Sequence, residues 1–286
     1  MYSFPIGVII DSFRLPIPEA VKKAALLGAS GIQVYSTYGE MAPENLTGAK
    51  RRDFARLVAD NGLVISALCG DLGGGGFTKK EKNREKIDRS KLILDLAKEL
   101  GTDVVTTHIG VVPEDPSHDR YKIMQEACRE LAEYADDVGA HFAIETGPET
   151  SLVLKGFLDS LGSRGVSVNL DPANLVMVTG DDPAQAVYHL RDYIVHTHAK
   201  DGVRLAEQSP EVIYGLAKSE IVTGPSFIEV PLGEGQVPWP AYLSALDDIG
   251  YRGFLTIERE VGDDPAADIG KAVEFLRARI GEGGTA

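Results

Sequence analysis

The chain has 286 residues, of which 43% are hydrophobic and 25% charged, so it has the composition of an ordinary globular protein with enough chain to bury a core. Its formal net charge of -14 argues against nucleic acid as a partner, because binding to phosphates depends on a basic surface. No run approaches the roughly 20 apolar residues that cross a bilayer, so no membrane partner is expected either. With two cysteines and no signal-peptide pattern in MYSFPIGVII, the sequence predicts a cytoplasmic protein.

Short β-branched runs alternate with amphipathic stretches along the whole chain, as is typical of parallel βα units. Strands are predicted at residues 6–10, 31–35, 63–69, 103–108, 142–146, 166–171, 194–198 and 254–258. Helices are predicted near residues 18–28, 49–61, 79–100, 119–138, 150–162, 184–191, 239–249 and 265–280. Pro18 at the start of the first helix and Gly28 at its end are residues that favour these positions.

Eight strand–helix repeats without a break in composition favour a single (β/α)8 TIM barrel over residues 1–286, a length that is ordinary for this fold. The alternative is a doubly wound sheet, which usually has a glycine-rich phosphate loop after its first strand. Here that strand is followed by DSFR at residues 11–14, and the glycines at 73–76 lack the Lys-Ser/Thr of a P-loop. The long loop 202–238 after the seventh strand lacks strong periodicity, and we expect it to act as a lid.

Polar residues end the fifth to eighth predicted strands, where a barrel places its catalytic groups. They are Glu145, Asp171, His198 and Glu258. Each could instead cap a helix or pair with a basic side chain, but three converging carboxylates would repel one another unless a cation neutralised them. An oxygen-rich set with one imidazole favours one divalent ion, and we expect Mn²⁺ ahead of Mg²⁺, Co²⁺ or Zn²⁺.

Two residues before each of these ends, the alternation of a strand places a second residue on the same inner face. These residues are Ala143, Asn169, His196 and Thr256, whereas an ordinary barrel interior would have Val, Ile or Leu there. The sequence therefore predicts a second layer in which Asn169, His196 and Thr256 orient the ligands through hydrogen bonds.

Four segments resemble the xylose isomerase-like barrel superfamily, which includes ketose 3-epimerases, hydroxypyruvate isomerases, inosose dehydratase and endonuclease IV. They are AIETGPET, VNLDPANL, IVHTHAKD and EVPLGEGQVPWPAYLSALDDIGYRGFLTIERE. The resemblance implies that Glu145, Asp171, His198 and Glu258 bind the metal. It also implies that Arg204, six residues after the ligand histidine, contacts substrate hydroxyls. Asn174 replaces a histidine of the ketose epimerases, so the substrate contact at that position is altered.

The resemblance implies a metal-dependent isomerase or epimerase of a sugar or sugar phosphate, with a small carbohydrate as substrate and a homodimer or homotetramer as assembly. Glu145 and Glu258 would move a proton next to a carbonyl through a metal-stabilised enediolate. We also assign His108 and Lys200 to substrate binding, because both lie at the same strand ends.

Three alternatives stay open at this point. A lyase or dehydratase acting on a keto-sugar or inosose would use the same chemistry but expel a leaving group. An endonuclease IV-like DNA repair enzyme would need more histidine and glutamate ligands and a basic face. A sugar-binding protein without activity would not need the acidic set.

Overall fold

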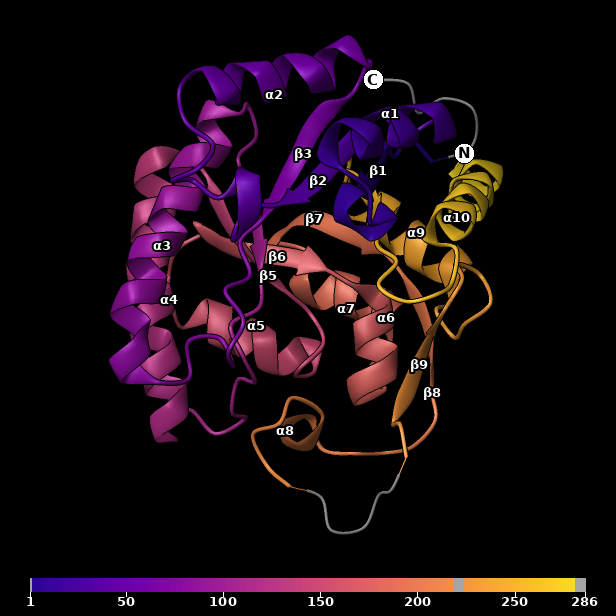
Figure 1. Cartoon of the computed structure of the whole chain (residues 1–286). Coiled ribbons are helices and arrows are strands. Elements are labelled where there is room, and N and C mark those ends of the chain that lie inside the picture. Colours follow the sequence, from indigo (N-terminus) through magenta and orange to yellow (C-terminus); the bar gives the residue numbers. More distant parts are fainter. Residues whose placement is uncertain (1, 219–223, 281–286) are drawn as a thin grey trace.

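Eight parallel strands close into a barrel in the computed structural model, which describes residues 2–218 and 224–280 (Figure 1). Around the barrel the strand order is β1, β10, β7, β6, β5, β4, β3 and β2. The barrel strands are β1 (Ile6–Ile9), β2 (Gly31–Tyr35), β3 (Val64–Cys69), β4 (Val104–Thr107), β5 (His141–Glu145), β6 (Val166–Leu170), β7 (Ile194–Ala199) and β10 (Leu255–Ile257). The predicted TIM barrel is therefore confirmed.

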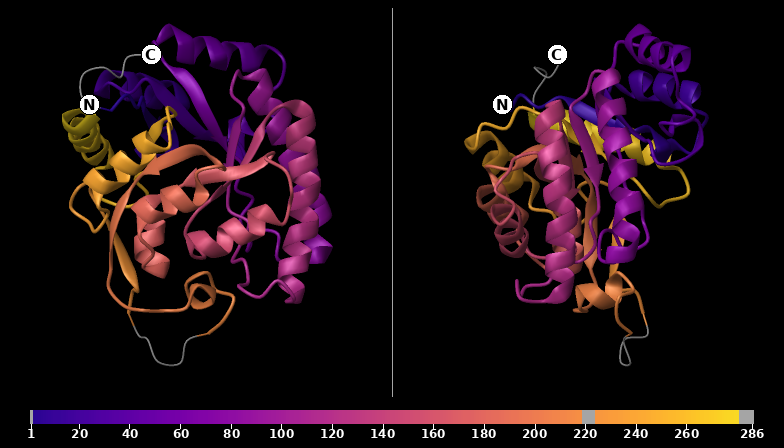
Figure 2. Two further views of the ribbon diagram at one scale, coloured as in Figure 1. Left: turned by 180° about the vertical axis from the view of Figure 1, so that it is seen from behind. Right: turned by 90° about the vertical axis from the view of Figure 1, so that its left-hand side faces the viewer.

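Helices surround the barrel, and the long α3 and α4 lie side by side on one flank (Figure 2). The outer helices are α1 (Ile17–Leu27), α2 (Ala49–Asp60), α3 (Lys80–Glu99), α4 (Asp119–Val138), α5 (Ser151–Asp159), α7 (Pro183–Leu190), α9 (Trp239–Asp248) and α10 (Pro265–Ile280). The shorter helices are η1 (Ile10–Phe13), η2 (Gly39–Met41), α6 (Pro172–Asn174), η3 (Leu175–Thr179) and α8 (Pro210–Ile213).

Only one predicted boundary differs from the structure by more than one residue. The fifth helix was expected to reach residue 162, but α5 ends at Asp159. The hydroxyl of Ser160 donates to the carbonyl of Phe157 at 2.6 Å, and Gly162 turns the chain with a φ of +66°. A side chain that competes for a helical carbonyl is a local signal that apolar periodicity does not contain.

The segment predicted as a loop at residues 202–238 contains regular structure. Strand β8 (Asp201–Arg204) pairs antiparallel with β9 (Phe227–Val230), and α8 lies between them at one end of the barrel (Figures 1 and 2). Asp201 holds the base of this hairpin, since its carboxylate accepts hydrogen bonds from the backbone N–H groups of Gly233 and Val237 and from the indole of Trp239. The expectation of an irregular loop was therefore wrong for the residues of β8, α8 and β9, and residues 219–223 lie outside the described chain.

The barrel interior contains polar as well as apolar side chains. Ala67, Val104 and Ala143 form a small apolar cluster apart from the main core. Gln33, Thr106 and Asn169 are buried and polar, and hydrogen bonds join Gln33 to Thr106 and to His198. A barrel interior normally fills with branched apolar side chains, so these polar residues direct attention to the site beside them.

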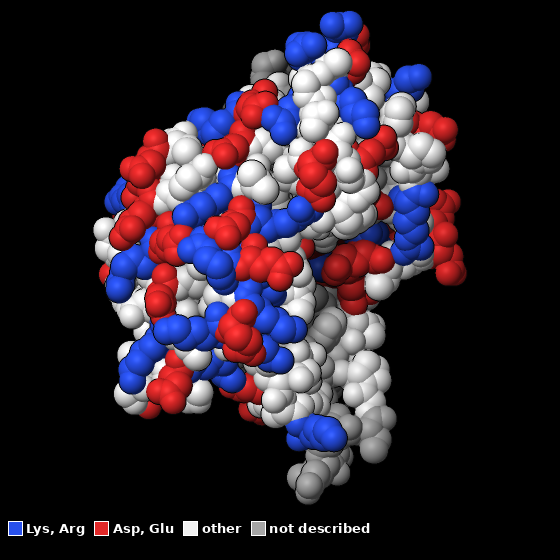
Figure 3. Space-filling model, turned by 60° about the vertical axis from the view of Figure 1, so that its left-hand side comes forward, with Lys and Arg blue, Asp and Glu red and all other residues white. Residues whose placement is uncertain are grey.

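Acidic and basic side chains are interspersed over the face that Figure 3 shows, which includes α3 and α4. Arg84 illustrates the pattern, since it pairs with Asp88 on its own helix and with Glu130 on α4. Among the described residues, no helix combines the length and the apolar character needed to cross a membrane.

A glycine turn after β3 provides a stability test. Gly74 and Gly76 both have positive φ, at +61° and +63°. A Cβ on Gly76 would overlap the backbone of Ile109 and Gly110, whereas a Cβ on Gly74 would meet only the Lys86 amine at 3.7 Å. We expect Gly76→Ala to lower the free energy of unfolding by about 3 kcal/mol or more, and Gly74→Ala by about 1–2 kcal/mol, which is the cost of the left-handed backbone alone. Urea denaturation of the two variants measures the difference, and equal losses would contradict the steric argument.

Candidate metal centre

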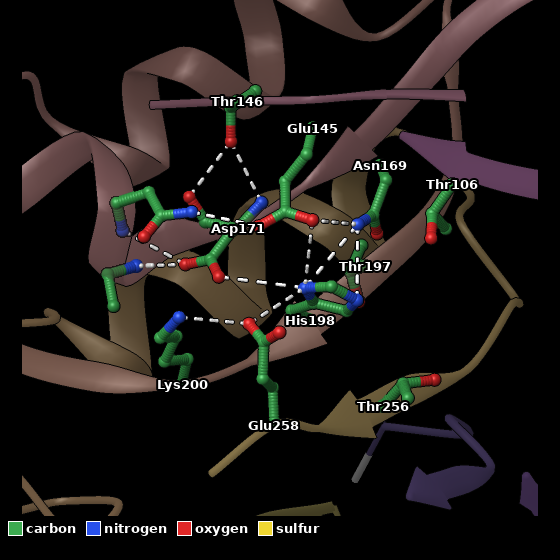
Figure 4. Close-up of polar contacts among 12 residues, drawn as sticks. Thr106, Glu145, Thr146, Asn169, Asp171, Thr197, His198, Lys200, Thr256 and Glu258 are labelled. Atoms are coloured by element: carbon green, nitrogen blue, oxygen red, sulfur yellow. Dashed lines mark hydrogen bonds and ion pairs between the residues drawn. The ribbon is translucent and has the colours of Figure 1, made fainter. Parts of the chain in front are cut away.

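Four side chains from four neighbouring strands converge at the carboxyl end of the barrel (Figure 4). They are Glu145 at the end of β5, Asp171 directly after β6, His198 in β7 and Glu258 directly after β10. Each offers one ligand atom, and these four atoms lie within 4.8 Å of one another. All four residues are buried, with exposed fractions between 0% and 8%. We refer to them below as the four-residue cluster.

The turn after β6 fixes Asp171. One carboxylate oxygen, Oδ1, accepts hydrogen bonds from the N–H groups of Ala173 and Asn174 and so caps the short helix α6. The Thr146 hydroxyl donates to the carbonyl of Asp171 and accepts from its N–H. The other carboxylate oxygen, Oδ2, is buried, has no hydrogen-bond partner within residues 2–218 and 224–280, and lies 3.6 Å from Nδ1 of His198. A buried carboxylate oxygen without a partner is costly, so this atom requires a cation or donor.

His198 is oriented by a side chain from the opposite side of the barrel. Its Nε2 lies 3.2 Å from Oε1 of Gln33, whose amide nitrogen donates to Thr106 at 2.9 Å. A proton on Nε2 therefore satisfies Gln33 and leaves Nδ1 directed at the carboxylates. That nitrogen lies 3.3 Å from Glu258 and 3.5 Å from Glu145. Such a partner on the second ring nitrogen is common for metal-binding histidines.

A chain of hydrogen bonds runs beneath the cluster. Nδ1 of His196 lies 2.9 Å from Oδ1 of Asn169, and its Nε2 lies 3.0 Å from the Thr256 hydroxyl. The amide nitrogen of Asn169 donates to Oε2 of Glu145 at 3.2 Å. Burial lowers the pKa of His196 well below 6.5, and the charge of His198 lowers it further. The neutral ring can therefore donate to Asn169 and accept from Thr256, so the three residues lie where the second layer was predicted.

Amide groups also hold Glu145 on its other side. Asn174 donates to Oε1 of Glu145 at 2.9 Å, while Nε2 of His108 lies 3.5 Å from the same oxygen. Nδ1 of His108 lies 3.3 Å from Asp71. Burial works against the protonated form of His108, but the charges of Glu145 and Asp71 outweigh it and raise its pKa to about 9. A protonated His108 can donate a hydrogen bond at the edge of the cluster.

Lys200 lies beside Glu258 and is itself buried. Its amine donates to Oε2 of Glu258 at 3.0 Å and to Glu260 at 2.5 Å, and it lies 3.8 Å from Glu229. Glu229 is bound in turn by Arg259 at 2.7 Å. Burial raises the pKa of Glu258, but the charges of Lys200 and His198 outweigh it and hold that pKa well below 4.5. Glu258 is therefore ionised and can bind a cation or accept a proton.

The charges of the cluster favour a cation at its centre. Burial lowers the pKa of His198, but Glu258 and Glu145 raise it well above 6.5. Burial raises the pKa of Asp171, and the neighbouring carboxylates add to the increase. All three carboxylates face Nδ1 of His198 and stabilise positive charge there. A divalent ion held among the four residues would satisfy the unpartnered oxygen of Asp171. The four residues therefore fit a metal of the type that oxygen and imidazole ligands select.

A pocket of about 410 Å³ opens above the cluster, and we call it the central pocket. The predicted residues Glu145, Glu258, His108, Asn174 and Lys200 all contribute to its wall. Arg204, to which the resemblance assigned a contact with substrate hydroxyls, lines a neighbouring side pocket of about 460 Å³. The two pockets share Val111, Pro148 and Val178 as a common wall.

Several residues of this region were not selected from the sequence. Asp71 follows β3 by two residues, so the rule of polar strand ends would have identified it. Gln33 is a polar residue inside an otherwise apolar strand, which is a weaker signal of the same kind. Glu229 lies in β9, and its approach to Lys200 depends on a hairpin that was not predicted.

Glu149 lines the side pocket. Its Oε2 accepts a hydrogen bond from the N–H of Val112 at 3.1 Å, while its Oε1 is buried without a partner in the part of the chain that the structure describes. Burial raises the pKa of this carboxyl from 4.5 to about 8. The protonated form therefore stabilises the fold fully below pH 4.5, and this contribution is lost as the pH rises through 8.

We expect Glu149→Gln to remove this pH dependence. Relative to the variant, the wild-type free energy of unfolding should fall between pH 5 and pH 9 by an amount on the order of 4 kcal/mol. Urea titrations of both proteins across this pH range measure the difference. A constant difference at every pH would contradict the raised pKa.

The fold and the buried cluster together define a TIM-barrel protein with a site suited to one divalent cation. Residues 21–279 match the family of xylose isomerase-like TIM barrels, and the chain belongs to this family. It is 23% identical over 284 residues to fructoselysine 3-epimerase of Escherichia coli O157:H7, covering 94% of this chain and 95% of that protein.

Two solved structures extend the comparison. A xylose isomerase domain protein from Planctomyces limnophilus is 26% identical, with a TM-score of 0.79 and 98% of both chains covered. A xylose isomerase-like TIM barrel protein from Mycobacterium smegmatis, solved in complex with magnesium, is 18% identical, with a TM-score of 0.70 and coverage of 98% of this chain and 100% of that one. The second likeness concerns the fold alone.

Proposed function

We propose that the protein is a metal-dependent sugar isomerase or epimerase that moves a proton next to a carbonyl group. The observation that carries the proposal is the four-residue cluster, whose Glu145 and Glu258 line the wall of the central pocket. The similarity to fructoselysine 3-epimerase supports a carbohydrate substrate. A cytoplasmic location and a homodimer or homotetramer stay predictions from the sequence.

The proposed ligands of the metal are Glu145, Asp171, His198 and Glu258. When bound, the ion would supply a Lewis acid that polarises the substrate carbonyl and neutralises the negative charge that develops there. Manganese is the ion we expect, and magnesium is the first alternative. Asp171 and His198 are buried and are fixed by α6 and Gln33, so their proposed part is to hold the ion.

Glu145 and Glu258 carry the proton transfer in this proposal. One of them removes the proton from the carbon next to the carbonyl, and the other returns it. Asn174 and Asn169 keep Glu145 in place by donating to its two oxygens, while Lys200 keeps Glu258 ionised. His108 and Lys200 face the same pocket as donors that can bind substrate oxygens.

Solvent deuterium exchange tests the proposal. Protein loaded with Mn²⁺ is incubated in D₂O with free ketoses, aldoses and inososes, and NMR follows deuterium entering carbon. We expect exchange at the carbon next to the carbonyl of at least one sugar, with an isomer or epimer as product. A dehydrated product would identify the lyase alternative, and no exchange with any substrate would overturn proton transfer.

The endonuclease alternative has less support. Within residues 2–218 and 224–280 the four-residue cluster is the one group found that could hold a metal. A metal cluster for phosphodiester hydrolysis needs further ligands of the same kind. The formal net charge of -14 also argues against binding to a DNA backbone, which depends on a basic surface.

A further inference from the structure

Two buried polar atoms belong to residues that line the side pocket. Its wall includes Arg204 at the end of β8 and Glu149 before α5. Among the residues that the structure describes, Nε of Arg204 and Oε1 of Glu149 are both buried without hydrogen-bond partners. Buried groups of this kind are rare in native proteins because each costs free energy, and a ligand is one way to satisfy them.

The side chain of Arg204 lies at the wall of the side pocket and packs against a glycine. Within the described residues, its side chain forms no ion pair with a carboxylate. It packs against Gly180, where a Cβ would overlap Nη1. A glycine at this position therefore leaves room for the arginine at the pocket wall. The backbone N–H of Arg204 donates to Gln236, which fixes the strand that carries the side chain.

The charge of the side pocket indicates which ligands suit it. Besides the cationic Arg204, its wall contains four glutamates, of which Glu211 is already paired with Arg120 at 3.0 Å. The carboxylates of Glu114 and Glu207 oppose a phosphate, and the guanidinium of Arg204 opposes an ammonium group placed against it. A hydroxyl group is uncharged and can accept both from Arg204 and from Glu149, whose carboxyl is kept protonated by burial. The volume of about 460 Å³ lies in the range of small-molecule sites.

We propose that the side pocket binds a neutral, hydroxyl-bearing unit attached to the reacting sugar, so that the preferred substrate is larger than a monosaccharide. The two pockets meet at Pro148 and Val178, which places the attached unit beside the central pocket. This inference rests on the proposed function, since the reacting sugar must occupy the central pocket.

Binding measurements with defined sugars test the proposal. Calorimetry with Mg²⁺-loaded protein compares D-fructose with a panel of glucosyl-fructoses in different linkages and with fructose 6-phosphate. At least one disaccharide should bind about 10-fold more tightly than fructose, as expected for one or two hydrogen bonds. Equal or weaker binding of every disaccharide would overturn the proposal, and so would tightest binding of the phosphate.

Two variants locate the attached unit. Arg204→Ala should weaken disaccharide binding about 10-fold and leave fructose binding within about 2-fold. Gln208→Trp, at the rim of the side pocket alone, should produce the same selective loss by filling the space. Arg52→Ala, on the exposed face of α2, is the matched control and should change neither affinity. Equal loss for both sugars in Arg204→Ala would place this arginine at the reacting sugar and overturn the proposal.

Deuterium exchange separates this inference from the proposed function. If fructose exchanges deuterium but disaccharides gain nothing in affinity, the side pocket proposal fails and the proposed function stands. If the disaccharide binds tightly and selectively but no sugar exchanges deuterium, the proposed function fails, and the side pocket would belong to a sugar-binding site without this chemistry.

Discussion

Glu258→Gln is expected to reduce turnover and deuterium exchange by about 10²–10⁴-fold, the contribution of a positioned acid–base group. Glutamine keeps an oxygen that can accept from Lys200, so the surroundings of residue 258 change little. It cannot accept the substrate proton, because its amide is not a base at neutral pH. Initial rates measured at equal metal content, with the metal determined by elemental analysis, give the fold-change.

Glu145→Gln should cause at least as large a loss. Both oxygens of Glu145 accept hydrogen bonds from amide groups, from Asn169 and from Asn174, so a glutamine must direct its own NH₂ at one of these donors. We expect metal affinity to fall together with the rate. Glu260→Gln is the control, since Glu260 contacts Lys200 at the pocket wall without being one of the four ligands. Near-full turnover in both variants with metal still bound would disprove the proton-transfer mechanism.

Removal of the metal is expected to lower the melting temperature. An ion present at 100 times its dissociation constant stabilises the folded state by about 2.7 kcal/mol. For a chain of this size that corresponds to a shift of about 4–5 °C. The physical reason is that an ion held by the cluster would relieve the repulsion among three buried carboxylates and would satisfy Oδ2 of Asp171. Thermal unfolding of chelator-treated protein, before and after addition of Mn²⁺ or Mg²⁺, measures the shift.

Asp171→Asn should abolish most of this ion-dependent shift. The asparagine oxygen can still cap α6, so helix capping is retained while the negative charge is lost. Asp53→Asn, at an exposed position of α2, should leave the shift unchanged. A shift that persists in Asp171→Asn, or one that is absent in the wild-type protein, would contradict the assignment of the cluster.

The pattern of the chain was sufficient to predict the barrel, because its strands and helices repeat locally. The β-branched run of residues 31–35 became β2 without a change of boundary, and the same holds for residues 119–138 in α4 and 265–280 in α10. Helix α5 was predicted too long, since the Ser160 hydroxyl competes for a carbonyl inside the last turn. The β8–β9 hairpin was missed because its strands are 22 residues apart and pair through backbone contacts.

The sequence alone determined which residue types end the strands, and in a closed barrel the carboxyl ends of all parallel strands lie at the same face. For this reason Glu145, Asp171, His198 and Glu258 could be grouped before any coordinates were known, with Asn169, His196 and Thr256 beneath them. Only the tertiary structure decided which partner each side chain has. Gln33 orients His198 from across the barrel, Glu229 reaches Lys200 from a hairpin, and Arg204 lines a separate pocket. Contacts between distant segments depend on how loops pack over the barrel, and no local periodicity encodes that packing.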